Sequence, residues 1–294
     1  MRLLFLFIIC LIPVYTNGQI PAKIEDDSLF GKDRYYLKQI SKVTKPKGVL
    51  VLIPGYGEHP YAVSAQTSIL QEAEKNGLAV IMVNLTPNNE DLPINDTSLS
   101  TLANMIKHFY KEEKLPSSTN LYIGGFSIGG TAAMRFYTKK NREFTIKKVF
   151  AIDPPLDMVR LKKSLSKGRE QQVIQKLDLL ISENVDKDLA LQELSVYNPS
   201  HPKPEKLPNY EQTALRIYCE PDILWWIKNR NMDLSDMNVT DCAGYVNAIL
   251  KKDRNQKAEL ILTKGMGIRN GDQVHPHSWS IAEPADLVWW LLKE

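Results

Sequence analysis

Cysteine and histidine are scarce in this chain of 294 residues, which contains three cysteines and five histidines. Cys10 lies in an apolar N-terminal segment, so only Cys219 and Cys242 remain for the folded part of the chain. One potential bridge is too few for a disulfide-stapled scaffold, and although the two could pair in an oxidising compartment, we expect free buried thiols. No convincing third ligand accompanies His275 and His277, so the sequence predicts no metal site.

Internal repeats, low-complexity tracts and a large excess of one charge are also missing. The 37 basic and 34 acidic residues give a formal net charge of +3, which is spread along the chain. Basic residues are not interleaved with aromatic residues as they are in nucleic-acid-binding proteins, so we expect no nucleic-acid partner. The length is enough for one large α/β domain or two small ones.

Long apolar runs are confined to the N-terminus. Arg2 precedes an apolar run over residues 3–12, and Pro13 and the small residue Gly18 follow it. This pattern is typical of a secretory signal peptide, and the run is too short to span a bilayer as a stable helix. The sequence therefore predicts a signal peptide over residues 1–18, a secreted or periplasmic location, no stable membrane span, and a single domain over residues 19–294.

Apolar runs rich in β-branched residues alternate with helix-forming segments through the rest of the chain. The predicted strands occupy residues 48–53, 78–83, 121–123, 147–152, 214–219 and 258–263. Such alternation predicts an α/β fold with a mostly parallel sheet covered by helices. Residues 19–32 are polar, and we expect them to form a mobile arm before an edge strand at 34–40. Residues 156–210 lack a strand pattern and are predicted to form a helical cap inserted into the domain.

One serine lies in a sharp turn between a predicted strand and a predicted helix. Ser127 has a glycine two positions away on either side, at Gly125 and Gly129. Strand, glycine-rich turn and helix in this order are typical of a nucleophile elbow, in which a larger side chain at either flanking position would collide with the turn. Ser127 is therefore the candidate nucleophile, and the backbone N–H of Ile128 is a candidate donor to a substrate oxyanion.

Over residues 34–294 the chain resembles the α/β-hydrolase family. The resemblance is carried by Gly-Phe-Ser-Ile-Gly at 125–129, Pro-Gly-Tyr-Gly at 54–57, Glu-Pro-Asp at 220–222 after a strand, and His-Ser-Trp at 277–279 before the last helix. The order serine, aspartate, histidine along the chain matches that family and differs from the other serine-hydrolase folds. The resemblance implies a catalytic triad of Ser127, His277 and Asp222, with the cap inserted before the strand that bears the acid.

The base and the acid both have alternatives. A serine hydroxyl needs a neighbouring imidazole to take its proton, and we prefer His277 because it adjoins the last helix, with His275 as the alternative. An acid must hold that imidazole in the correct tautomer. The resemblance favours Asp222, with Glu220 and Asp153 as alternatives. Two prolines follow Asp153, and we expect this residue to end its strand and brace the cap.

The loop after the first buried strand contains two glycines, and the backbone N–H of Tyr56 within it is the second candidate oxyanion donor. Neither a His-Gly pair nor a triple-glycine run is present there, so the lipase-type oxyanion loop is not carried over. Trp225, Trp226 and Trp279 are candidate substrate-binding residues, although such aromatic residues are more often core contacts. The loop that contains Arg269 is expected to shape the mouth of the pocket.

Together these features predict an exported serine hydrolase that cleaves a carboxylic ester, or an amide, through an acyl-enzyme, with no metal or organic cofactor. The expected partner is a small-molecule ester or a peptide- or glycan-linked ester. Two alternatives stand beside this reading: a catalytically inactive α/β-hydrolase-fold binding protein that uses its cap as a contact surface, and an acyltransferase with the same triad. Because a fold does not fix a substrate, the sequence does not identify it.

Overall fold

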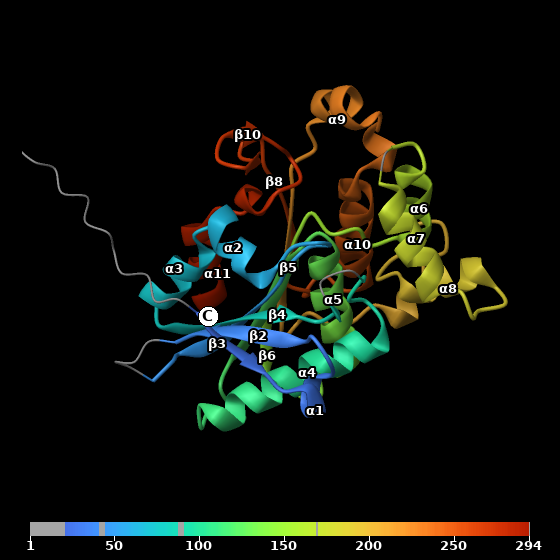
Figure 1. Ribbon diagram of the computed structural model, residues 1–294. Helices are drawn as coiled ribbons and strands as arrows, with labels where there is room; N and C mark the ends of the chain where they lie inside the picture. Colours follow the sequence, from blue (N-terminus) through green and yellow to red (C-terminus); the bar gives the residue numbers. More distant parts are fainter. Residues whose placement is uncertain (1–20, 41–44, 88–90, 169, 294) are drawn as a thin grey trace, which may run out of the picture.

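A twisted sheet of eight strands forms the centre of the protein (Figure 1). The structure is a computed structural model that describes residues 21–40, 45–87, 91–168 and 170–293. The predicted signal peptide lies outside these described residues. The strands follow one another across the sheet in the order β1-β2-β4-β3-β5-β6-β7-β8, so the chain crosses over between strands that are not neighbours in sequence.

The sheet is mostly parallel, as the alternation of strands and helices predicts. Its strands are β1 (Ala22–Glu25), β2 (Tyr35–Gln39), β3 (Gly48–Ile53), β4 (Leu78–Asn84), β5 (Leu121–Phe126), β6 (Ile146–Ile152), β7 (Ala214–Cys219) and β8 (Ala258–Leu262). The first two strands run antiparallel to their neighbours, and the other six run parallel to one another. Every residue of β3, β4 and β5 is buried, because helices cover both faces at the centre of the sheet.

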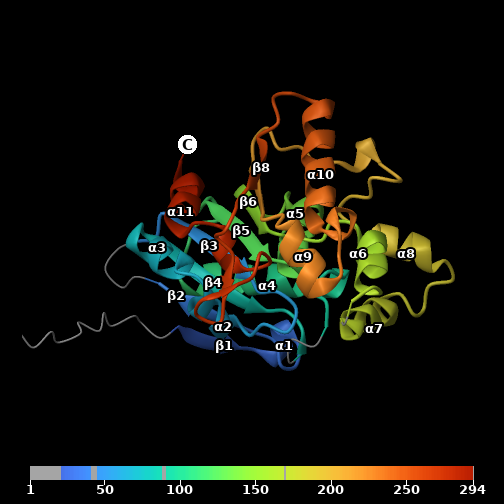
Figure 2. The ribbon, with the colours of Figure 1, turned by 90° about the horizontal axis from the view of Figure 1, so that it is seen from above.

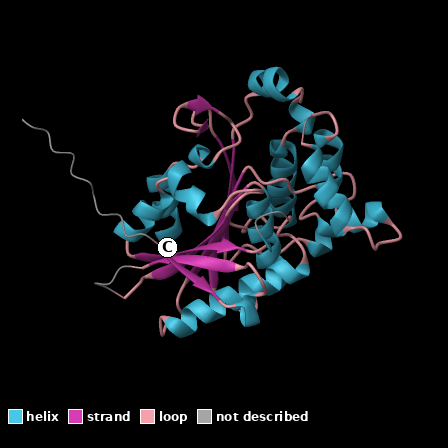
Figure 3. Ribbon diagram, viewed as in Figure 1, coloured by secondary structure: helices cyan, strands magenta, loops and turns pink. Residues whose placement is uncertain are grey.

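Helices lie on both sides of the sheet, and each face has its own hydrophobic core (Figures 2 and 3). One face is covered by α2 (Pro60–Gln66), α3 (Ile69–Lys75) and α11 (Pro284–Leu292), and the other by α4 (Asp96–Glu112), α5 (Ile128–Lys140) and α10 (Asn238–Lys252). The short elements are α1 (Asp27–Phe30), α9 (Ile223–Arg230) and the hairpin of β9 (Ile268–Arg269) and β10 (Gln273–Val274). In Figure 1 the hairpin and α9 project above the sheet, at the end where the parallel strands finish.

Three helices inserted between β6 and β7 form the cap, as predicted. They are α6 (Met158–Leu165), α7 (Gln171–Leu180) and α8 (Lys187–Leu194). The buried carboxylate of Asp241 on α10 joins the cap to the body of the domain, because it accepts hydrogen bonds from Arg160 Nε at 3.1 Å and from the Leu156 N–H at 3.3 Å. The start of the cap is therefore fixed close to the carboxyl end of β6.

The expectation of a mobile arm over residues 19–32 is wrong for the residues that the structure describes. β1 pairs antiparallel with β2, so β1 and not the segment at 34–40 forms this edge of the sheet. The carboxylate of Asp26 then caps α1 by accepting hydrogen bonds from the backbone N–H groups of Ser28 and Leu29. The polar composition that suggested an arm is instead that of an edge strand with much of its surface in water.

The two cysteines are buried free thiols, as expected. Burial raises the pKa of both Cys219 and Cys242, which keeps them protonated. Among the described residues, no helix has both the length and the apolar character needed to cross a membrane.

Candidate active site

Ser127 lies in a strained turn between β5 and α5. Its backbone has φ 53° and ψ −127°, a region that residues other than glycine rarely occupy. A Cβ atom on Gly125 or Gly129 would overlap the carbonyl oxygen of Ile53 in the neighbouring strand. Glycine at these two positions is therefore what allows the turn to sit against β3, and the turn has the form of the predicted nucleophile elbow.

The structure brings Ser127 and His277 into hydrogen-bond contact. The Nε2 atom of His277 lies 3.0 Å from Ser127 Oγ, and its Nδ1 atom lies 2.5 Å from a carboxylate oxygen of Asp153. If Nδ1 donates its hydrogen to this carboxylate, Nε2 is left as the acceptor for the serine hydroxyl. A serine, an imidazole and a carboxylate thus form one chain of hydrogen bonds, the geometry expected of a serine-hydrolase triad.

The prediction that Asp222 is the partner of the histidine is wrong: Asp153 holds that position. Asp222 instead caps α9, where its side chain accepts a hydrogen bond of 2.9 Å from the Trp225 N–H. Asp153 follows β6 directly and is only 6% exposed. Its φ of 45° turns the chain sharply at the strand end, and its own N–H donates to Tyr218 O in β7 at 2.7 Å. The role expected for Asp153, bracing the cap, is therefore replaced by contact with His277.

Glu220, the other alternative acid, fixes the loop that leads to the histidine. Its carboxylate is 4% exposed and accepts hydrogen bonds from Thr263 Oγ1 at 3.1 Å, from the Met266 N–H at 2.9 Å and from the Gly267 N–H at 3.2 Å. These bonds tie the chain that leaves β8 to the end of β7. Sequence reasoning did not find this function, although an acidic residue directly after a buried strand was the signal for it.

His275 lies beside the candidate triad but is not part of it. Its ring is 4.6 Å from the ring of Trp225, and its Nε2 atom is 3.4 Å from a guanidinium nitrogen of Arg230. Burial, with Arg269 and His277 nearby, lowers the pKa of His275 to about 3. The neutral ring of His275 packs at a tilt against Trp225, whereas Ser127 Oγ contacts His277, so the preference for His277 over His275 agrees with the geometry.

Glu58 holds the loop that carries Tyr56. One of its carboxylate oxygens accepts hydrogen bonds from the Gly55 N–H at 3.0 Å and from Trp279 Nε1 at 3.0 Å. Ile128 is the first residue of α5, so its N–H has no acceptor within the helix. Both Tyr56 and Ile128 line the same cavity as Ser127, which is where the sequence expected the two oxyanion donors to lie.

A cavity of about 230 Å³ opens over Ser127 between the sheet edge and the cap. Its walls include His277 and Trp226, and apolar side chains of the cap such as Leu161 and Val173. Trp226 therefore lies where a substrate-binding residue was predicted. The candidate site thus combines a hydroxyl and an imidazole with a small, largely apolar enclosure, a common composition for small-molecule sites.

The predictions for two tryptophans need correction. Trp279 is fully buried, and its ring centroid lies 5.7 Å from that of Phe126, so it belongs to the core that supports the site. Trp225 packs at a tilt against His275 and donates its indole N–H to Val274 O at 3.1 Å; it is not among the described residues that line the cavity. Adjacent aromatic residues on a short helix point in different directions, which explains why only one of the pair faces the cavity.

Arg269 brings a positive charge to the cavity from the β9–β10 hairpin, as the expectation for its loop suggested. Its guanidinium carbon lies 5.0 Å from the Phe126 ring centroid, and its nearest carboxylate among the described residues, Glu58, is 3.9 Å away. Burial lowers the pKa of Arg269. Within the described part of the chain, no three histidine, cysteine, aspartate or glutamate side chains are grouped as a metal site would need.

Comparisons with known proteins agree with this architecture. No protein-family model matches the sequence, and no curated protein matches it. Among solved structures, carboxyl esterase 2 of the mycorrhizal fungus Tuber melanosporum is 14% identical with a TM-score of 0.59, over 88% of this chain and 81% of that one. The siderophore hydrolase EstB of Aspergillus fumigatus is 12% identical with a TM-score of 0.54, over 95% of this chain and all of that one. Est1E of Butyrivibrio proteoclasticus is 12% identical with a TM-score of 0.52, over 91% and 95%.

At these identities the likeness concerns the fold. The chain has the α/β-hydrolase fold, with a mostly parallel eight-stranded sheet and the helices α6–α8 as an insertion. Several of the similar structures are esterases or lipases by name.

Proposed function

We propose that the protein is an exported serine hydrolase that cleaves small carboxylic esters through an acyl-enzyme. One observation carries the proposal: Ser127, His277 and Asp153 form a continuous chain of hydrogen bonds at the wall of a cavity. Hydrolases and esterases among the proteins of similar fold support it. The position of each of these three hydrogen-bonded residues assigns it a role in the reaction.

The first half of the reaction forms the acyl-enzyme. His277 Nε2 takes the proton of Ser127 Oγ as this oxygen attacks the acyl carbon, and Asp153 stabilises the imidazolium that forms. The backbone N–H groups of Tyr56 and Ile128 are assigned to the oxyanion of the tetrahedral intermediate. The imidazolium then gives its proton to the leaving alcohol, so the C–O bond breaks without release of an alkoxide.

The second half reverses these proton movements with water in place of the alcohol. His277 removes a proton from water, the hydroxide attacks the acyl carbon, and the proton returns to Ser127 Oγ as the acid product leaves. The cavity of about 230 Å³ lies below the usual size range of sites for drug-sized ligands, so we expect acetate and butyrate esters to react faster than long-chain esters.

The test is covalent labelling by a fluorophosphonate probe, followed by peptide mass spectrometry. We expect one modified residue, Ser127, and loss of labelling and of p-nitrophenyl butyrate hydrolysis in Ser127→Ala. Ser117→Ala is the matched control, because Ser117 is exposed in the loop before β5. A folded wild-type protein that neither takes up the probe nor hydrolyses any ester would contradict the proposal and favour the inactive binding protein.

Two further measurements separate the remaining parts of the proposal. If added alcohols are converted into ester products faster than water yields acid, the protein is an acyltransferase with the same residues. Export rests on residues 1–18 alone, and we expect protein recovered outside the cytoplasm to begin at Gln19. An intact N-terminus beginning at Met1 would contradict this part while leaving the hydrolase proposal in place.

A further inference from the structure

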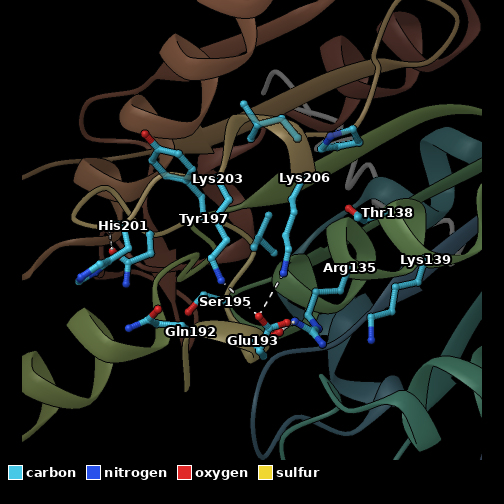
Figure 4. Close-up of a pocket in the computed structure, with 14 residues that line it drawn as sticks. Arg135, Thr138, Lys139, Gln192, Glu193, Ser195, Tyr197, His201, Lys203 and Lys206 are labelled. Atoms are coloured by element: carbon cyan, nitrogen blue, oxygen red, sulfur yellow. Dashed lines mark hydrogen bonds and ion pairs between the residues drawn. The ribbon is translucent and has the colours of Figure 1, made fainter. Parts of the chain in front are cut away.

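A second cavity, of about 340 Å³, lies between α5 and the segment that leaves the cap. We call it the α5–cap pocket, and Figure 4 shows the side chains that line it. One wall is the second half of α5, with Arg135 and Lys139. The opposite wall is the end of α8 and the chain that follows it, with Glu193, Lys203 and Lys206. Ser127 and His277 are not among the described residues that line it.

The charges in this pocket are unbalanced. Four cationic side chains line it, whereas Glu193 is the only carboxylate among the described lining residues. Lys203 and Lys206 both lie close to the same Glu193 oxygen, at 3.3 and 3.1 Å, and in Figure 4 both reach toward it. These two hydrogen bonds lower the pKa of Glu193, and one carboxylate thus serves two ammonium groups. Lys139 pairs with Asp96 outside the pocket.

Arg135 is the most unusual of these cations because it is only 6% exposed. Its one hydrogen bond among the described residues goes from NH1 to the backbone carbonyl of Glu193, at 2.8 Å. Its buried Nε has no acceptor, and no described carboxylate lies within ion-pair distance. Burial lowers the pKa of Arg135, and Asp96 and Glu193 offset this only in part and from beyond ion-pair distance. Burying a guanidinium without a carboxylate in contact is costly, and a protein recovers part of that cost when an anion binds beside it.

Apolar side chains complete the pocket. Tyr197, Val196 and Leu207 contribute carbon surface next to the cationic groups. A free inorganic ion would leave this surface in water, whereas an organic anion would cover it. The composition therefore fits a ligand with an anionic group at one end and a ring or short chain at the other.

We propose that the α5–cap pocket binds a small organic anion, whose phosphate or carboxylate oxygens lie between Arg135, Lys203 and Lys206 and whose apolar part lies against Tyr197. Guanidinium and ammonium groups are the usual partners of such oxygens, and Arg135 has free N–H groups to offer. The proposal stands independently of whether Ser127 is a nucleophile, because the pocket uses none of the residues of the candidate active site.

Binding there would connect the cap to the candidate active site. Ser195 Oγ accepts a hydrogen bond of 2.9 Å from the Met158 N–H, and the Val196 N–H donates to Leu156 O at 2.9 Å. Met158 begins α6, which contributes a wall of the cavity over Ser127. An anion that joins this segment to α5 is thus expected to stabilise the cap.

The experiment measures binding of phenyl phosphate and of benzoate to the whole protein by calorimetry and by the shift in Tm, with sodium chloride at equal ionic strength as the reference. We expect at least one probe to raise Tm where the chloride reference does not. Binding of the phosphate probe alone identifies a phosphate site, and binding of both shows that a carboxylate is also accepted.

The double variant Lys203→Gln/Lys206→Gln should weaken binding about tenfold or more, because it removes two charge-assisted contacts. The matched control is Lys107→Gln/Lys140→Gln. Those two lysines also share one glutamate, Glu143, through its two different oxygens at 2.7 and 2.8 Å, and lie outside the pocket. The control should bind as the wild type does. Equal loss in both double variants, or no Tm shift beyond that of chloride, would overturn the proposal.

Arg135→Met provides a second, independent readout. Removing a buried charge that has no carboxylate in ion-pair contact should leave the Tm of the unliganded protein unchanged or higher, and should abolish anion binding. A variant that folds and still binds phenyl phosphate or benzoate with the wild-type Kd would show that Arg135 is not part of the site and would overturn the proposal.

Discussion

The residues that follow β6 and β7 are similar in sequence, but their carboxylates bind different partners in the structure. Each strand is followed directly by an acidic residue and then a proline, with Asp153 after β6 and Glu220 after β7. Both carboxylates are buried at the same edge of the sheet. Asp153 contacts the imidazole of His277, whereas Glu220 binds backbone N–H groups of the loop that delivers this histidine.

The position of each strand explains the difference. β6 is the neighbour of β5, which ends directly before Ser127, and β7 lies one strand further away. Adjacent strands are about 4.8 Å apart, so a side chain at the end of β6 can share an imidazole with Ser127 more easily than one at the end of β7. The left-handed φ of Asp153 then directs its carboxylate toward the ring. Asp153 after β6 thus contacts the candidate base His277, and Glu220 after β7 supports the loop that leads to it.

Removing the charge of Asp153, directly after β6, should have the largest effect on catalysis. Asp153→Asn keeps the shape of the side chain but no longer favours the Nδ1–H tautomer or the imidazolium. We expect kcat/KM for p-nitrophenyl butyrate to fall about 10³- to 10⁴-fold, with little change in KM. Far-UV circular dichroism checks that the variant is folded. A loss of less than tenfold would show that Asp153 is not the acid.

Removing the charge of Glu220, directly after β7, should mainly lower the stability of the fold. Glu220→Gln replaces a charged acceptor of two backbone N–H groups, and we expect the free energy of unfolding to fall by about 1.5 to 3 kcal/mol. Urea denaturation measures this change. Thr263→Val is the matched control, since it removes one neutral donor to the same carboxylate and should cost about 1 kcal/mol. Equal costs for the two variants would contradict the role given to Glu220.

The segment between β8 and His277, which contains His275, should make the stability of the fold depend on pH. Because the pKa of His275 is about 3 in the folded state and about 6.5 when unfolded, the unfolded chain binds the additional proton between these values. Stability is therefore highest above about pH 6.5 and falls as the pH is lowered toward 3. His275→Gln should reduce the difference between urea midpoints at pH 7 and pH 5. An unchanged difference would argue against a buried neutral His275.

Substitution of Asp222 should have the smallest effect on catalysis. Asp222→Asn retains an N-cap acceptor for α9 and should leave both stability and kcat/KM within about twofold of the wild type. Asp222→Ala removes the cap and should lower the free energy of unfolding by about 1 kcal/mol without a larger loss of activity. A large loss of kcat/KM in Asp222→Asn would restore the expectation from family resemblance.

The parts of the molecule that the sequence predicts correctly rest on local patterns. Runs such as that of β3 are apolar on both faces because both faces are covered, and this is visible in the residues alone. The pattern at Ser127 is likewise local, since Gly125 and Gly129 lie within two residues of the serine, although the contact that requires glycine there is with Ile53 of β3. The cap also follows from a local absence of strand pattern between β6 and β7.

The parts that the sequence misses depend on contacts between distant segments. The order serine, acid, histidine holds for Asp153 as well as for Asp222, so chain order alone does not distinguish them. The choice depends on the path of the loop before His277, which Glu220 fixes through hydrogen bonds across more than 40 residues of sequence. The burial of Trp279 also depends on a contact between distant segments, because its indole N–H donates to Glu58 in the loop after β3.

The most direct test of the account compares the rate at which a fluorophosphonate labels Ser127 in Asp153→Asn and in Asp222→Asn. This rate depends on activation of the serine and not on the choice of substrate. The account predicts labelling slowed about 10³-fold or more in Asp153→Asn and unchanged within about threefold in Asp222→Asn. Slow labelling of Asp222→Asn with normal labelling of Asp153→Asn would contradict it.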